Sequence, residues 1–187
     1  MATTTTKKTT TKSTSAKSET VDAQEEYTQT TVNSRIIANE IDMNQLIPVQ
    51  NGYQGRLIYK SGRTNEEFVW EQFGDEQDME LRELRYAKGS AKSFFENNWF
   101  MFPDEYQWVI QYLNVKQFYK NAIDIEHFDD VYKKSPKEIE AALSNLSDGQ
   151  KRSVAYRASE LIRCGEIDSN KAIAALESAL GVELIER

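Results

Sequence analysis

The sequence contains almost none of the residues that build disulfides and metal centres. Its 187 residues include one cysteine, Cys164, and one histidine, His127. One cysteine cannot form a disulfide within the chain, and one cysteine with one histidine cannot supply the four ligands of a structural zinc site. We therefore expect no metal site and no bound cofactor, and we expect Cys164 to fill space as a small apolar side chain.

Glycine-rich phosphate loops and long hydrophobic runs are missing as well. None of the eight glycines fits a dinucleotide-binding or P-loop spacing, and there is no G-x-S-x-G nucleophile motif. No run approaches 18 apolar residues, so we expect no membrane span and no membrane partner. The N-terminus lacks the apolar segment of a signal peptide, which predicts an intracellular product or a component of a particle assembled inside a cell. We find no candidate catalytic residues and expect a protein that is not an enzyme.

The charge balance is acidic. Thirty Asp and Glu residues against 23 Lys and Arg give a net charge of −7. A protein that coats nucleic acid needs a broadly basic face, so nucleic acid is a less favoured partner. Aromatic residues make up 11% of the chain, which is more than a disordered chain usually contains.

Residues 1–34 are predicted to form a flexible arm rich in Thr and Lys. The first 20 residues contain nine Thr, a single acid and no large apolar residue after Met1. Such a segment buries too little surface to offset the entropy lost on ordering. The alternative is an arm that becomes ordered against a partner or that threads between subunits. Its lysines are Lys7, Lys8, Lys12 and Lys17.

Residues 35–134 are predicted to hold one β-hairpin and several helices around an aromatic cluster. Apolar residues between 36 and 49 indicate a short helix or an extended strap. Residues 56–60 and 66–73 flank a glycine-containing turn, with Phe68 and Trp70 on one face of the return strand. Because an isolated hairpin is marginal in water, its apolar face is expected to pack on helices.

Helices are predicted from Asp75 onward. Asp75 is expected to cap a helix that runs to residue 87 or 97, and Asp104 a helix over 105–113. Shorter helices are expected over 114–122 and 125–132. Residues 135–187 are predicted to form three helices, continuous with the same domain. They begin at the Ser135–Glu138 capping box, cover 150–164 before Gly165, and cover 170–180 before Gly181. The expected fold class is therefore α+β and mostly helical, with one hairpin packed on a multi-helix bundle.

An aromatic segment supplies the first candidate partner contacts, Trp99, Phe100 and Phe102. It lies within residues 94–102, where six of nine side chains are apolar. Two interpretations remain open. The segment is either the central core between the hairpin and the bundle, or it is partly exposed and buried against a neighbouring protein.

Two charged patterns supply the remaining candidates. Eight acids and one base lie between residues 66 and 83, without the spacing of a calcium loop, and Glu76 and Asp78 are the candidate contacts there. The run is either a solvated face that favours a helix N-terminus or a docking surface for a basic partner. Arg152 and Arg157 lie on the 150–164 helix, which is conceivable as a DNA-reading helix. The carboxylates around His127, in residues 126–130, are interpreted as solvated surface.

Several segments together resemble a known family. They are Gly74-Asp75-Glu76, residues 94–101, Ser135-Pro136-Lys137-Glu138-Ile139, Gly149-Gln150-Lys151-Arg152 and Gly165-Glu166-Ile167-Asp168-Ser169. They resemble small tailed-bacteriophage proteins encoded among the virion structural genes of phages of Gram-positive hosts, over residues 40–187. The resemblance implies a virion structural protein of the capsid, neck or tail, present in multiple copies, contacting other virion proteins and assembled in the host cytoplasm. It carries over no site residues. The alternative is an intracellular phage regulator that binds DNA or a polymerase.

Overall fold

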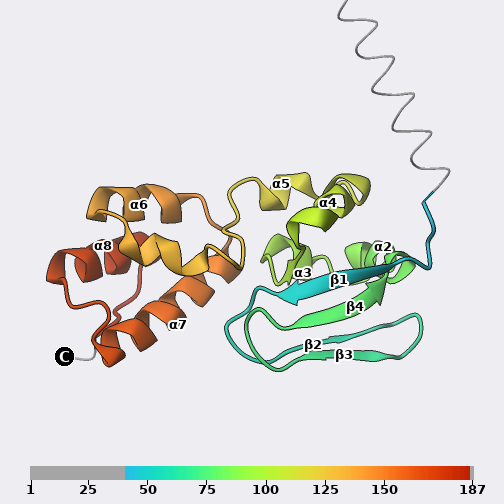
Figure 1. The fold of residues 1–187 in the computed structure, drawn as a ribbon, viewed down its shortest axis with the longest axis horizontal. Helices are drawn as coiled ribbons and strands as arrows, with labels where there is room; N and C mark the ends of the chain where they lie inside the picture. The colour runs from blue at the N-terminus through green and yellow to red at the C-terminus, as the bar shows by residue number, and fades with distance from the viewer. Residues whose placement is uncertain (1–40, 186–187) are drawn as a thin grey trace, which may run out of the picture. The chain divides into compact units, whose positions relative to one another are not determined.

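The computed structural model describes residues 41–185, so the predicted arm over 1–34 lies outside the described residues. The chain from Asp42 onward forms one compact unit of the α+β class, mostly helical, as predicted (Figure 1). The strands are β1 (Leu46–Asn51), β2 (Leu57–Lys60), β3 (Glu67–Trp70), β4 (Glu76–Glu80) and β5 (Phe100–Met101). The α-helices are α2 (Leu81–Ser90), α3 (Ser93–Glu96), α4 (Trp108–Tyr112), α5 (Lys116–Tyr119), α6 (Pro136–Ser144), α7 (Asp148–Cys164) and α8 (Asn170–Leu180). Two 3₁₀ helices are η1 (Asp104–Tyr106) and η2 (Phe128–Lys133).

The predicted hairpin is confirmed as the antiparallel pair β2 and β3, although its return strand ends at Trp70 and not at residue 73. Leu57 lies opposite Trp70, and Tyr59 lies opposite Phe68. Leu57, Tyr59 and Trp70 are buried, because alternate residues of each strand share one face; the rings of Tyr59 and Trp70 on that face contact Phe100 of β5. The indole Nε1 of Trp70 donates a hydrogen bond of 2.8 Å to the carbonyl of Val49, which fastens the hairpin to β1.

A second sheet, in the order β4-β1-β5, was not predicted. On its inner face Ile47, Val49 and Met79 are fully buried. On its outer face Pro48 lies opposite Asp78. Proline has no N–H to donate, but β5 pairs only with the last two residues of β1, so β1 has one neighbouring strand at Pro48.

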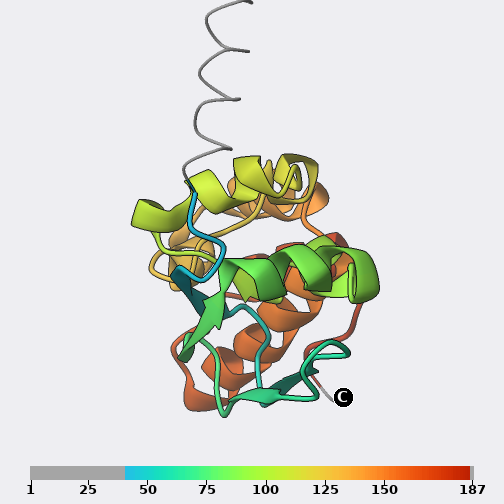
Figure 2. The same cartoon turned by 90° about the vertical axis from the view of Figure 1, so that its right-hand side faces the viewer.

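The helix predicted to start at Asp75 is wrong over residues 76–80, which form β4. The Asp75 carboxylate instead accepts hydrogen bonds of 2.9 Å from the backbone N–H groups of Glu71 and Gln72, and so closes the turn before β4. The helix begins only at Leu81, directly where β4 ends, as Figures 1 and 2 both show. Acidic residues that suit a first helical turn lie in a strand here, because β1 offers them a pairing partner.

The middle of the chain is helical in shorter pieces than predicted. The helix expected over 105–113 divides into η1 and α4, and Asp104 makes no side-chain capping bond. The helix expected over 114–122 is the single turn α5, and the segment expected over 125–132 is the 3₁₀ helix η2.

The three C-terminal helices are confirmed with their caps. Ser135 and Glu138 form the predicted capping box, in which the backbone N–H of Ser135 donates to the carboxylate at 3.0 Å. The hydroxyl of Ser135 also donates to this carboxylate, at 2.6 Å, and the hydroxyl and backbone bonds together lower the pKa of Glu138. Helix α7 begins at Asp148, two residues before the predicted start, because the hydroxyl of Ser147 accepts the N–H of Gln150. Gly165 and Gly181 end α7 and α8 with positive φ angles of 79° and 69°.

The first turn of α7 packs directly on the loop that follows α3. A side chain at Gly149 would overlap the carbonyl oxygen and side chain of Asn97, so there is room for hydrogen only. In the same way, a side chain at Gly52 would overlap the carbonyl of Asn98. Backbone meets backbone at both places.

Two buried polar side chains of α7 complete this contact. The amide of Gln150 bonds both backbone groups of Ile123, accepting from its N–H at 3.0 Å and donating to its carbonyl at 2.6 Å. The hydroxyl of Ser153 donates to the carbonyl of Gly52 at 3.0 Å. Both side chains are 1% exposed, so the start of α7 is bonded to the turn after β1 and to the segment before η2.

We expect Gly149→Ala to destabilise the protein by roughly 1 to 3 kcal/mol, since a methyl group forces α7 away from Asn97. The matched control is Gly89→Ala in α2, where an added methyl would contact nothing within 4 Å. That substitution is expected to raise stability by up to about 1 kcal/mol through helix propensity. Urea unfolding measures both, and equal effects would show that Gly149 has room for a side chain.

Candidate functional site

The aromatic segment is mostly core. The ring of Phe100 contacts four other aromatic rings at centroid distances of 4.8 to 5.6 Å; these belong to Tyr59, Trp70, Phe94 and Phe95. Phe100 is fully buried and Phe102 is 4% exposed. The hypothesis that these two side chains contact a partner is therefore corrected, because the fold already buries them. The core interpretation fits them both.

Trp99 is the one aromatic candidate that reaches the surface. It is half-buried, and its ring packs edge-on against Tyr53 at 6.0 Å and Phe94 at 5.4 Å. Its indole Nε1 has no acceptor among the described residues. Tyr53 beside it is 36% exposed. Of the three predicted aromatic contacts, only Trp99 belongs to a surface that a partner can reach.

The acidic candidates Glu76 and Asp78 lie on the outer face of β4. Side chains two residues apart on a strand point the same way, so both project outward, and both are exposed. Neither forms an ion pair within the described part of the chain. Glu80, the next acid on this face, differs because it pairs with Arg63 and Arg82.

The last acid of the run, Glu83, is part of the core. It is 2% exposed and accepts a hydrogen bond of 2.7 Å from the hydroxyl of Tyr59 and one of 3.0 Å from Nε of Arg63. Burial, together with the bond to this carboxylate, raises the pKa of Tyr59. A buried carboxylate destabilises the fold unless it is paired, and here Arg63 of the hairpin turn pairs with Glu83 of α2. This ion pair holds the hairpin turn against α2.

The basic candidates on α7 differ from each other. Arg157 donates two hydrogen bonds to Asp129, at 3.1 and 2.7 Å, and lies 3.6 Å from Glu160. These bonds to Asp129 raise the pKa of Arg157. Arg152 is exposed and makes no ion pair within residues 41–185. Only Arg152 of the two is therefore free to meet another molecule.

The segment around His127 divides between surface and structure. His127 and Asp130 are exposed, 3.4 Å apart, and Lys133 binds Asp130 at 2.8 Å and lowers its pKa. Phe128 is buried, however, and Asp129 holds Arg157. The solvated-surface interpretation therefore applies to part of the segment only.

Three further observations concern residues 41–185. No group of three or more His, Cys, Asp or Glu side chains there is placed to hold a metal ion. No helix in that range is long and apolar enough to cross a membrane. Cys164 is exposed, so its predicted role as an apolar core residue is wrong; it lies at the last position of α7, where the helix ends at Gly165.

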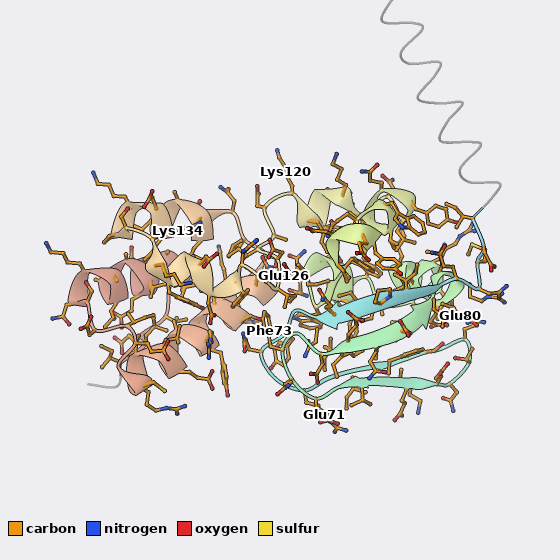
Figure 3. The ribbon with its side chains drawn as sticks, in the orientation of Figure 1. Glu71, Phe73, Glu80, Lys120, Glu126 and Lys134 are labelled. Atoms are coloured by element: carbon orange, nitrogen blue, oxygen red, sulfur yellow. The ribbon has the colours of Figure 1, made fainter. Side chains whose placement is uncertain are left out.

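A groove beside α7 was not predicted. Its volume is about 470 Å³, and Tyr156, 56% exposed, forms part of its rim. Phe73 and Phe128 form part of its wall, with their ring centroids 4.6 Å apart. Figure 3 shows Phe73 and Glu126, which both line the groove, close to each other, while Glu80 lies at the far end of the sheet. The remaining lining residues are Gln54, Gly55, Gln72, Ile125, Asp129, Arg157 and Glu160.

We expect Phe100→Ala to cost roughly 3 to 5 kcal/mol of stability, because it empties the centre of the aromatic cluster. Trp99→Phe is the companion substitution. It keeps a ring against Tyr53 and removes an indole N–H that has no acceptor, so a change within about 1 kcal/mol is expected. Thermal or urea unfolding measures the stability of both variants. A loss of stability for Trp99→Phe as large as that for Phe100→Ala would contradict the assignment of Phe100 to the core and Trp99 to the surface.

Charge reversal is expected to separate the two arginines. Arg157→Glu places a carboxylate beside Asp129 and Glu160 and should cost roughly 1 to 2 kcal/mol. Arg152→Glu at the exposed position should stay within about 0.5 kcal/mol. Urea unfolding at low and high salt gives the comparison; a neutral Arg157→Glu would mean that the ion pair adds nothing to stability.

Comparison with known proteins adds nothing to these observations. No protein-family model, curated protein or solved structure shows a significant match to this chain. The exposed features that the described residues offer for interpretation include the groove beside α7, the acidic face of β4, Trp99 with Tyr53, and Arg152.

Proposed function

We propose that this chain is a non-enzymatic structural component of a tailed-bacteriophage virion, acting through protein–protein contacts as one of multiple copies. The observation that carries the proposal is the groove beside α7. It combines an exposed aromatic side chain, a concave surface and a rim of polar and charged groups, which is the composition of surfaces that bind other proteins.

Several buried polar side chains of the protein hold its backbone in place. The amide of Asn51, fully buried, donates to the carbonyls of Gly55 and Gln72 and accepts from the N–H of Tyr53. Gln150 bonds both backbone groups of Ile123. Side chains used in this way fix loops in place, and rigid loops suit a protein whose function depends on the shape of its surface.

The segments that carry the resemblance to phage structural proteins also have defined places in the fold. The 94–101 segment meets the 149–152 segment where Gly149 packs on Asn97. The Ser135–Ile139 segment starts α6 with its capping box. The Gly165–Ser169 segment joins α7 to α8, with Ser169 capping α8. Residues of the resembling segments thus take part in packing and helix capping, as expected of a protein that acts through a fixed surface.

The alternative of a regulator that binds DNA or a polymerase through α7 receives less support. Arg157 is neutralised by Asp129 and Glu160. Gly149, Gln150 and Ser153 face the interior. A helix that reads DNA needs a cluster of free basic or amide side chains on one face. Lys151, Arg152 and Arg163 of α7 form no ion pair within residues 41–185, but the acidic Glu160 lies between Arg152 and Arg163 along the helix.

The proposal is tested by mass spectrometry of gradient-purified phage particles. We expect peptides of this chain in the particles, at a constant ratio to the major capsid protein after a wash in high salt. Detection in the infected-cell lysate and absence from washed particles would overturn the proposal and favour the regulator. Salt-sensitive DNA binding by the purified chain would point the same way.

A further inference from the structure

The groove beside α7 has an uncompensated negative charge. Its lining includes three carboxylates, of Glu126, Asp129 and Glu160, and one guanidinium, of Arg157. Two negative charges therefore remain. Asp129 is fully engaged with Arg157, whereas Glu126 is exposed and forms no ion pair within residues 41–185. The free charge lies at Glu126 and, in part, at Glu160.

An aromatic face adjoins these carboxylates. Tyr156 lies next to Arg157 on α7 and is 56% exposed, more than any other large apolar or aromatic side chain of the described residues. A cation held over an aromatic ring gains energy from the ring's negative face, and carboxylates beside it add to the attraction. The groove thus has the chemistry to hold lysine or arginine side chains of an extended peptide.

The chain contains a segment with that chemistry in its own sequence. Residues 1–20 carry Lys7, Lys8, Lys12 and Lys17 against the single acid Glu19. The stretch from Lys17 to Asp42 spans at most roughly 90 Å when extended. A compact domain of this size is on the order of 40 Å across, so this length suffices to reach a neighbouring copy.

We infer that the groove lined by Tyr156, Glu126 and Glu160 binds the lysine-bearing N-terminal segment of a second copy of this chain. The inference rests on the proposed function only in that copies lie side by side in an assembly. Each such contact is weak, and repetition around an assembly adds them together. The acidic face of β4 is the competing site, but it is part of an open sheet and offers its carboxylates no aromatic side chain in its register.

Zero-length crosslinking of the full chain tests the inference directly. Unlabelled and ¹⁵N-labelled copies are mixed and treated with a carbodiimide, which joins lysine amines to carboxylates in contact. We expect crosslinks from Lys7, Lys8, Lys12 or Lys17 to Glu126 or Glu160, with peptides of unlike label in one product. Crosslinks only between peptides of like label, crosslinks to Glu76 or Asp78 instead, or no crosslinks would each overturn it.

Peptide binding to the full chain gives an independent measurement. The receptor carries Lys→Gln at positions 7, 8, 12 and 17, so that its own segment does not compete, and the probe is a fluorescent peptide of residues 1–20. We expect Glu126→Gln with Glu160→Gln to weaken binding about fivefold, as two exposed ion pairs allow. Tyr156→Ala should weaken it about threefold.

The matched control is Glu76→Gln with Asp78→Asn, which removes the same charge from β4. It should leave the affinity within about twofold, since those carboxylates lie outside the groove. If the two double substitutions weakened binding equally, the effect would come from the net charge of the protein and not from the groove, and the inference would be overturned. These measurements use purified chain alone, so a negative particle analysis with a positive binding result would refute the virion assignment and leave the groove contact standing.

Discussion

The close approach of α7 to the loop after α3 is the constraint on which the other contacts depend. Because Gly149 has no side chain, the helix start lies against the backbone at Asn97. Only at that depth can the amide of Gln150 reach both backbone groups of Ile123. The segment that follows Ile123 is thereby positioned, and with it Asp129, which binds Arg157 about two turns further along α7 than Gln150. One glycine thus determines where the wall of the groove stands.

Elements with local signals could be predicted from the sequence, and elements that depend on distant partners could not. The capping box at Ser135 and the glycine that ends α8 lie within a few residues of what they control. Strand β4 has one buried residue, Met79, among acids, and its pairing with β1 joins residues about thirty positions apart. The same limit applies to the surfaces. The exposure of Glu76 follows from its location in an acidic run. The groove, in contrast, is built from four segments that are separate in the sequence. Phe100 is buried by aromatic residues from distant segments, which the local sequence pattern does not indicate.

Phenol hydroxyls provide a second set of ties between segments. Tyr119 donates to the carbonyl of Phe100 at 2.6 Å, and Tyr132 donates to the carbonyl of Val154 at 3.0 Å. Burial raises the pKa of both phenols, because a tyrosinate there would lose its hydration. Each bond joins a short helical piece, α5 or η2, to strand β5 or helix α7. The short helical pieces between β5 and α6 are therefore tied to the rest of the fold by their own tyrosine side chains, and by Gln150 of α7.

The exposure of Cys164 has a practical consequence for any assembly of this chain. It is the sole thiol in the sequence, and it stands at the end of α7 remote in sequence from the buried turn at Gly149. A maleimide dye would therefore mark each polypeptide once, at one defined place. Stepwise photobleaching of such particles would count the polypeptides in each, and energy transfer between dyes would report the spacing of symmetry-related helix ends without any engineered substitution.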